Sequence, residues 1–442
     1  MSPGAPFRTL PAPYVGTDGL IGPKPMFAPA WPIYTVLYGF SVFWVLGLAS
    51  FAWLVAAIPM LFWLMASKGT RLPGGTGIWV LFLGWVALSM PMVDTATSLA
   101  VWGHRFLLYV GAGIAFVYAY NIPRSGVSDR SIARAITALW ALVVLAGFAA
   151  IAFPQFEFRN PFQSLLPGGL AQNEYVVGLV QTRLAQIHDF LGFEVARPAA
   201  PFVYTNNWGS NFALLSPMVF VFTASLQGWR RVLLIAVGIA AIVPVVQSLN
   251  RGMWISLGIG LLYTAGRFAL SRGSRPPIAT VTAMALLVLV IVLTPLGSLI
   301  GDRLETGHSD ERRLSLYEQS IGAALEAPFF GHGGTVEDAT SVDPSGPPVG
   351  THGQIWVLLV SHGFPASLAF LGFFVYLLVR TGRSTTSPFV FGVNVTLVVA
   401  FVQMGIYFLI PSQLPLLMVV SALALRHLDA GRSDGRRATR GE

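Results

Sequence analysis

The feature that most constrains this chain is a series of long apolar runs separated by short polar segments. Charged residues make up 10% of the 442 residues and the mean hydropathy is +0.67, whereas an ordinary soluble domain has about 25% charged residues. An α-helix that crosses a bilayer needs about 20 consecutive apolar residues. The sequence therefore predicts an integral membrane protein and excludes a soluble catalytic domain.

The apolar runs predict an all-α polytopic membrane protein with about twelve transmembrane helices and both termini on one side. Residues 31–67 are too long for one span, and Gly47–Ser50 offers a tight turn between two helices. No alternation of apolar and polar residues dominates, as it would in a transmembrane barrel. The remaining predicted spans cover residues 77–93, 99–119, 132–153, 207–226, 231–248, 252–270, 277–298, 353–379, 387–410 and 411–427.

The charges between these spans predict the orientation, because cytoplasmic loops carry an excess of Lys and Arg. With the N-terminus inside, 19 of the 27 basic residues fall in inner segments and 14 of the 19 acidic residues fall in outer segments. The pI of about 10.0 is then a consequence of membrane topology, and a nucleic-acid surface is not expected.

The predicted spans and orientation divide the chain into a disordered cytoplasmic tail at 1–30, a transmembrane domain at 31–427 and a basic cytoplasmic tail at 428–442. Two extracytoplasmic loops, 154–206 and 299–352, are long enough to be functional. In the first, apolar residues at three-to-four spacing from Val176 to Leu191 predict an amphipathic helix. In the second, RRLSLYEQSIGAALEAPFF predicts a helix, followed by a Gly- and Pro-rich flap from Gly331 to Gly350.

Basic residues that stay outside against this trend are candidates for binding anions. Arg251 lies in the short junction VQSLNRGMWIS, where it either holds a lipid-linked phosphate or anchors to headgroups. Arg312 and Arg313 open the loop helix, either as a guanidinium fork for a diphosphate or as an exposed ion-pair face. Arg105 falls within a span, which suggests a polar partner or a lipid phosphate.

Two further segments carry polar residues at the outer boundary. His352 precedes a spanning helix, and it is either a general base for an acceptor hydroxyl or a helix-end hydrogen-bonding group. In ARPAAPFVYTNNWG, Arg197 and Asn206 either line a cleft for an anionic substrate or, in the case of the asparagines and Thr205, cap the next helix.

Several common catalytic motifs are missing from the sequence. There is no GxxxxGK[ST] loop, no HExxH and no cysteine, so the sequence carries no phosphate loop, no zinc-protease signature and no thiolate site. The inner loops are too short to hold a nucleotide-binding domain.

Four motifs in order, however, resemble the O-antigen ligase and polymerase superfamily of bacterial membrane glycosyltransferases. They are RPAAPFVYTNNWG, SLNRGMW, RRLSLYEQSIGAALEAPFFGHG and THGQIWVLLVSHGFPA, within residues 195–380. Arg251 matches the arginine of the family's Ser-Arg-Gly motif, with Asn250 in place of the serine. Arg313 matches the arginine before its Leu-x-Leu-aromatic helix start, and His352 matches its catalytic histidine.

The resemblance implies transfer of a glycan from an undecaprenyl-diphosphate carrier to an acceptor hydroxyl, for polysaccharide biosynthesis in the cell envelope. It implies an inverting reaction on the outer face of the bacterial cytoplasmic membrane, with no metal and no other cofactor. His352 would be catalytic, while Arg251, Arg313 and Arg312 would bind the diphosphate. The expected partners are a lipid-linked glycan donor, a glycan, lipid or other envelope acceptor, and membrane lipids.

Two other functions fit parts of the same sequence. A polymerase of this superfamily would join lipid-linked repeat units with the same residues. A polysaccharide or lipid transporter would also have about twelve spans, but such proteins commonly contain internal repeats, and no convincing repeat is found here.

The predicted topology can be tested with single cysteines in this cysteine-free chain. We expect an impermeant thiol reagent to label Ser309→Cys in intact cells and to label Ser433→Cys only after the membrane is opened. Labelling of Ser433→Cys in intact cells would contradict the orientation.

Overall fold

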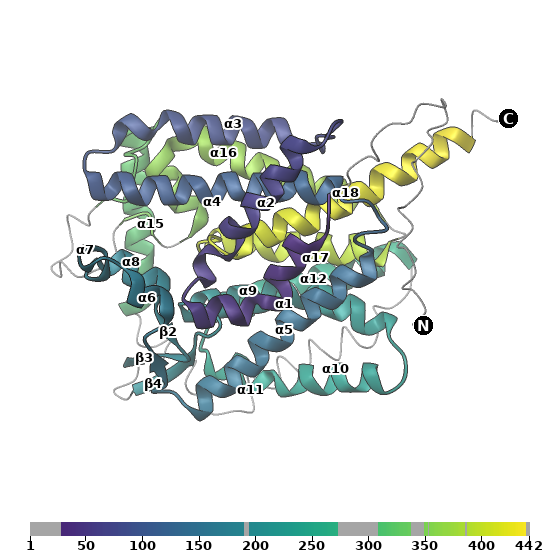
Figure 1. The fold of residues 1–442 in the computed structure, drawn as a ribbon, viewed down its shortest axis with the longest axis horizontal. Coiled ribbons are helices and arrows are strands. Elements are labelled where there is room, and N and C mark those ends of the chain that lie inside the picture. Colours follow the sequence, from purple (N-terminus) through teal and green to yellow (C-terminus); the bar gives the residue numbers. More distant parts are fainter. Residues whose placement is uncertain are drawn as a thin grey trace, which may run out of the picture.

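The chain forms a bundle of helices whose longer members run roughly along the longest axis of the molecule (Figure 1). The computed structural model describes residues 28–189, 194–272, 308–336, 349–351, 353–384 and 387–438. The bundle helices are α1 (Trp31–Leu46), α2 (Ala52–Ala66), α3 (Thr76–Leu88), α4 (Ala96–Asn121), α5 (Asp129–Ala152), α9 (Thr205–Ser225), α10 (Gly228–Ala240), α11 (Ile242–Gln247), α12 (Arg251–Arg272), α16 (Gln354–Gly382), α17 (Pro388–Met404) and α18 (Gln413–Ala438).

These helices follow the predicted apolar runs closely. The predicted break between the first two spans is present, because α1 ends at Gly47 with φ +80° and a short 3₁₀ turn at Ala49–Phe51 precedes α2. Glycine adopts this left-handed conformation without steric cost. A Cβ at Gly47 would also lie 2.1 Å from Asn160 Oδ1, so the turn packs directly against the first long loop.

Six helices in the described ranges have the length and hydropathy to cross a membrane: Ala49–Ala66, Ala96–Asn121, Asp129–Ala152, Gly228–Gln247, Gln354–Gly382 and Gln413–Gly431. Three shorter apolar helices are Trp31–Leu46, Thr76–Met92 and Pro388–Met404. Residues 207–226 and 252–270, also predicted as spans, lie largely in the helices α9 and α12, which are not among these candidates. The predicted span 277–298 lies outside the described residues. The membrane class is thus supported, and the count of twelve spans stays a prediction.

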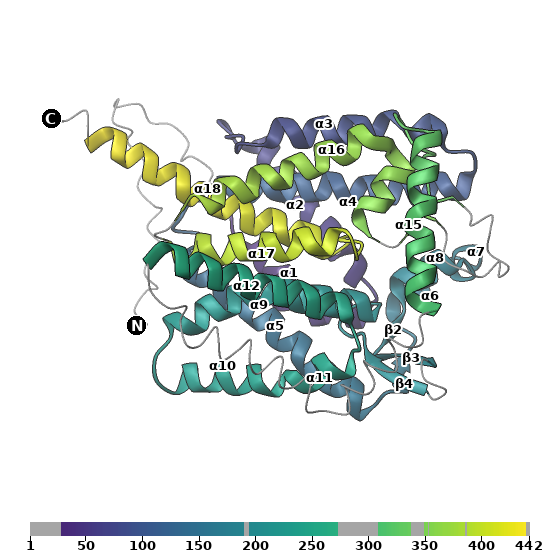
Figure 2. The ribbon, with the colours of Figure 1, turned by 180° about the vertical axis from the view of Figure 1, so that it is seen from behind.

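The two ends of the bundle differ in what joins the helices (Figures 1 and 2). One end, which we call the loop end, carries the small elements of both long loops. They are β1 (Glu157–Phe158), α6 (Pro161–Leu165), α7 (Gly168–Ala171), α8 (Glu174–Val180), β2 (Thr182–Arg183), β3 (Ala185–Asp189), β4 (Glu194–Pro198) and α15 (His308–Glu326). The opposite end carries the α4–α5 link, the start of α10 and the C-terminal part of α18.

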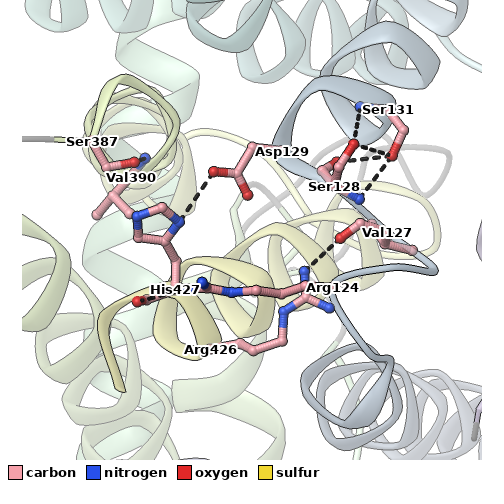
Figure 3. Close-up of polar contacts among 9 residues, drawn as sticks. All are labelled: Arg124, Val127, Ser128, Asp129, Ser131, Ser387, Val390, Arg426 and His427. Atoms are coloured by element: carbon pink, nitrogen blue, oxygen red, sulfur yellow. Dashed lines mark hydrogen bonds and ion pairs between the residues drawn. The ribbon is translucent and has the colours of Figure 1, made fainter. Parts of the chain in front are cut away.

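Polar contacts at the opposite end join α18 to the α4–α5 link (Figure 3). Arg426 donates to the Val127 carbonyl at 2.7 Å, and Arg124 donates to the His427 carbonyl at 3.3 Å. His427 Nδ1 lies 3.1 Å from Asp129 Oδ2. The helix ends gathered here carry basic residues that the charge rule assigns to the cytoplasm, and the orientation itself stays a prediction.

The first long loop corrects two predictions from the sequence. The amphipathic helix expected from Val176 to Leu191 ends at Val180, and the chain is then extended in β2 and β3. β1 pairs with β2 and β3 pairs with β4, both antiparallel, so the protein is not purely α-helical. The Asn160 side chain donates to the Val180 carbonyl at 2.6 Å and to Thr182 Oγ1 at 2.7 Å. These long-range bonds favour the extended chain over continuation of the helix.

The second long loop contains the predicted helix as α15. Of the predicted flap, residues 331–336 and 349–350 are described, and Val336 pairs with Val349 in an antiparallel bridge. The rest of the flap lies outside the described residues.

The helix α16 is interrupted at Gly363, where φ is +76° and ψ is −177°. The segment after α15 fills the break: His332 N donates to the Val360 carbonyl at 2.8 Å, and Phe364 N donates to the Pro328 carbonyl at 2.8 Å. Non-helical backbone at membrane depth is tolerated where protein groups satisfy its hydrogen bonds. The break therefore fixes the end of α15 against the middle of α16.

We predict that Gly363→Ala lowers stability by roughly 1–3 kcal/mol or more, because the backbone is left-handed there and strained for alanine. A Cβ at this position would lie 2.5 Å from the Phe329 carbonyl oxygen. The measurement is the melting temperature of the purified protein in detergent. Gly372→Ala, in the same helix with no atom within 4 Å of its added Cβ, is the matched control. Equal melting temperatures for the two variants would contradict the structure.

Candidate functional site

Arg251 is the first residue of α12 and follows a tightly held junction at the loop end. Asn250 is 2% exposed, and its Nδ2 donates to the Thr205 carbonyl at 3.3 Å. Its Oδ1 accepts from Met253 N at 3.2 Å and from the Tyr407 hydroxyl. The asparagine thus caps α12 and ties the α12 start to the start of α9 and to the α17–α18 link.

The start of α16 is held by the same link. Gly353 precedes α16 with φ +139°, and a Cβ there would lie 2.7 Å from the Gly405 carbonyl oxygen. Gln354 is fully buried: its backbone N donates to the Tyr407 carbonyl at 2.9 Å, and its Nε2 donates to the Tyr109 hydroxyl at 2.8 Å. His352 itself lies outside the described residues, between the described Thr351 and Gly353.

Tyr407 therefore joins the two segments that carry the predicted site. Its hydroxyl bonds Asn250, the neighbour of Arg251, and its carbonyl accepts from Gln354, two residues after His352. Residues about 100 positions apart in the chain are brought to one place at the loop end.

The helix α15 lies against the first turn of α16. The Tyr317 and Trp356 rings stack with centroids 4.6 Å apart and an interplanar angle of 18°. Trp356 Nε1 also donates to the Gly405 carbonyl at 3.0 Å. Arg312 and Arg313 belong to α15, about one turn before Tyr317, and their side chains lie outside what the structure describes.

Arg197 and Asn206 have different environments at this end. Arg197 is 8% exposed, and its Nε donates to the Ser248 carbonyl at 2.6 Å, so it braces the junction before Arg251. Asn206 is exposed. The expected side-chain cap on α9 is wrong for Thr205 and both asparagines, because the N-cap residue is Tyr204 without a side-chain cap bond. Thr205 N instead donates to Gln186 Oε1 of β3 at 2.8 Å.

Arg105 lies near the loop end of α4, with its guanidinium 5.3 Å from the centre of the Phe408 ring. It also interacts electrostatically with Tyr175 of α8, whose hydroxyl lies 2.8 Å from His104 Nδ1. The partner that the sequence could not name is thus an aromatic pair from two other segments.

The buried polar residues that hold this region together were not predicted from the sequence. Gln354 and Tyr407 were not singled out, although a fully buried glutamine at a helix start needs hydrogen-bond partners. His362 is 2% exposed, and its Nδ1 lies 2.7 Å from Ser89 Oγ, so it is a buried, hydrogen-bonded residue of the helix bundle. A separate cavity of about 410 Å³ between β1, β2, α6 and α8 is lined by none of the predicted site residues.

We predict that Asn250→Ser destabilises the protein, because the shorter side chain leaves the Thr205 carbonyl and the Tyr407 hydroxyl without their partner. An unsatisfied buried polar group costs about 1–3 kcal/mol. Asn206→Ser, on the exposed start of α9, is the control and should stay within about 0.5 kcal/mol. Thermal unfolding of both variants in detergent measures the difference, and an unchanged Asn250→Ser would refute the bridging role.

Comparison with known proteins agrees with these motifs. No curated protein matches the chain. Residues 235–371 match the family model described as O-Antigen ligase, and this segment contains Arg251, Arg313 and His352. Such a family implies lipid-linked glycan and polysaccharide partners in general. With the apolar helices, the match confirms the resemblance seen in the motifs and supports placing the chain in the O-antigen ligase and polymerase superfamily of membrane glycosyltransferase-like enzymes.

Proposed function

We propose that this protein transfers a glycan from a lipid-linked diphosphate carrier, such as undecaprenyl diphosphate, to an acceptor hydroxyl at the loop end. The observation that carries the proposal is the bridge made by Tyr407 between Asn250 and Gln354. Asn250 and Gln354, the neighbours of Arg251 and His352, both contact Tyr407, and both lie within residues 235–371, which match the O-antigen ligase family model.

Arg251 and Arg313, with Arg312 beside it, are proposed to bind the diphosphate. A guanidinium stays charged and offers paired donors that fit phosphate oxygens. The same donors would stabilise the charge that grows on the diphosphate as its bond to the anomeric carbon breaks. The diphosphate leaves with its lipid, and no metal ion or other cofactor is assigned a role.

His352 is the proposed general base. A neutral imidazole near pH 7 can accept the proton of the acceptor hydroxyl as its oxygen attacks the anomeric carbon. Attack opposite the leaving diphosphate inverts the anomeric centre. Arg197 supports the reaction indirectly in this scheme, since it braces Ser248, whereas the exposed Asn206 and the nearby Arg105 border the substrate cleft.

The proposed site faces outward across the bacterial inner membrane. This orientation is supported by the charge division of the sequence and by the position of the basic helix ends opposite the loop end (Figures 1 and 2).

A polymerase activity would use the same site, and the intermediates of a deletion strain distinguish the two. Loss of a ligase leaves lipid-linked polymer that is not transferred. Loss of a polymerase leaves single lipid-linked repeats. The family match fits both activities; the proposed ligase activity predicts accumulation of polymer, and the polymerase alternative predicts single repeats.

We predict that Arg251→Lys and Arg313→Lys each weaken binding of farnesyl diphosphate by about tenfold or more, because lysine loses the paired geometry. Equilibrium binding to purified protein in nanodiscs is the measurement. Arg231→Lys, at the exposed start of α10 on the opposite end, is the control. If Arg313→Ala leaves binding and transfer unchanged, α15 has only a structural role.

A second prediction concerns His352→Ala, which should reduce transfer by roughly 10²- to 10⁴-fold while donor binding is kept. The assay supplies purified protein with a lipid-linked glycan and an acceptor, with and without EDTA. His427→Ala, at the opposite end, should retain transfer. Full activity of His352→Ala would remove the histidine from the mechanism, and loss in EDTA that Mg²⁺ restores would overturn the metal-free reaction.

A further inference from the structure

Polar side chains from four elements meet between α4 and the first long loop. Arg105 comes from α4, Tyr175 from α8, Arg183 from β2, and Tyr204 is the N-cap residue of α9. The Tyr175 hydroxyl interacts electrostatically with Arg105 and lies 2.8 Å from His104 Nδ1. We call these four residues, without His104, the arginine–tyrosine seam.

Tyr204 lies beside α8, next to a residue one helical turn after Tyr175. A Cβ added at Gly178 of α8 would be 2.6 Å from the Tyr204 hydroxyl, and Gly178 is on the same face of α8 as Tyr175. Arg183 interacts electrostatically with Tyr204, and Tyr175 with both Arg105 and Tyr204. The seam therefore has an arginine at each end and two hydroxyls between them.

The seam has more donors than acceptors. The buried Nε atoms of Arg105 and Arg183, and Nε2 of the adjoining His104, have no hydrogen-bond partner in the structure as described. Glu157, paired with Arg183 across β1 and β2, interacts electrostatically with that arginine and supplies part of its counter-charge. Buried polar groups without partners are rare and call for an explanation such as a missing ligand.

Desolvation raises the pKa of the Tyr175 and Tyr204 hydroxyls, although Tyr204 as a whole residue is 43% exposed. Both hydroxyls therefore stay protonated near neutral pH. The Tyr204 hydroxyl can donate to an anion, whereas the Tyr175 hydroxyl donates to His104 Nδ1 when the histidine proton is on Nε2. The unpartnered Nε atoms of two guanidinium groups and the Tyr204 hydroxyl, beside the Glu157 carboxylate, leave donors for an anion with several acceptor oxygens.

We propose that the arginine–tyrosine seam binds the phosphate ester of a lipid at the membrane surface, as a site separate from Arg251 and Arg313. Tyr204 precedes Thr205, whose carbonyl accepts from Asn250, so the seam adjoins the candidate site. The lipid is either the glycan carrier or a membrane phospholipid. Only its identity as the glycan carrier rests on the proposed function.

The test uses the full chain in phosphatidylcholine nanodiscs and measures binding of farnesyl monophosphate, with farnesol as the uncharged probe. The background is Arg251→Met combined with Arg313→Met, so the proposed diphosphate site makes no contribution. In this background we expect saturable binding that Arg105→Met or Arg183→Met weakens by about 10- to 100-fold, because charge-assisted hydrogen bonds contribute about 1.5–3 kcal/mol. Tyr175→Phe and Tyr204→Phe, which keep the ring packing, should weaken it less.

Matched controls separate binding from folding. Arg159→Met, an exposed arginine on the same loop, and Tyr38→Phe, 50% exposed on α1, should bind as the background protein does. Melting temperatures without probe identify any variant that fails to fold. If an arginine variant does not fold, the two Tyr→Phe variants test whether these residues bind the probe. If binding is unchanged in the Arg105, Arg183 and tyrosine variants, the arginine–tyrosine seam does not bind lipid phosphate. This conclusion holds whatever the outcome of the transfer assay.

A further experiment identifies the source of the phosphate. Protein in nanodiscs containing phosphatidylglycerol is examined by native mass spectrometry, with and without farnesyl monophosphate. A retained phosphatidylglycerol that is lost in Arg105→Met and not displaced by the probe supports a membrane phospholipid. Displacement by the probe supports the lipid carrier, and retention of neither molecule contradicts the proposal.

Discussion

The break in α16 at Gly363 is the constraint on which the geometry of the loop end depends. A helix interrupted at membrane depth must satisfy its freed backbone groups with protein, and here the segment from Pro328 to Gly333 does so through three hydrogen bonds of 2.8–2.9 Å. Because this segment follows α15 directly, the break sets where α15 lies. The Tyr317–Trp356 stack then keeps the helix of Arg312 and Arg313 beside the start of α16.

The second requirement is a buried polar network that holds three helix starts together. Asn250, Gln354 and Tyr407 connect α12, α16 and the α17–α18 link, and Asn250 also reaches the start of α9. Such a network is costly unless every member is satisfied. Its value to the proposed reaction is positional, since Arg251 and His352 would have to act on opposite sides of one anomeric carbon. When the segments beside both residues are already held in place, less conformational entropy is lost as the lipid-linked donor binds.

Much of the helix layout could be predicted from the sequence, because apolar runs and turn residues such as Gly47 report directly on spans and their ends. The β-hairpins of the first loop could not, since they depend on long-range bonds from Asn160 and on pairing with residues 194–198. The arginines of the candidate site were visible as exceptions to the charge rule, and Arg251 does start a helix at the loop end. The partners of Arg105 and the role of Tyr407 were not visible, because both depend on contacts between distant segments.

The central claim is that a lipid-linked glycan is transferred at the loop end of this bundle. Proteoliposomes sorted for a single orientation of the protein test it directly, with donor in the bilayer and a water-soluble acceptor added to one side at a time. The account predicts glycosylated acceptor and free lipid diphosphate only when the acceptor is on the side of α6, α8 and α15. Transfer to an acceptor on the side of the α4–α5 link, or no transfer from either side under conditions where the donor binds, would contradict it.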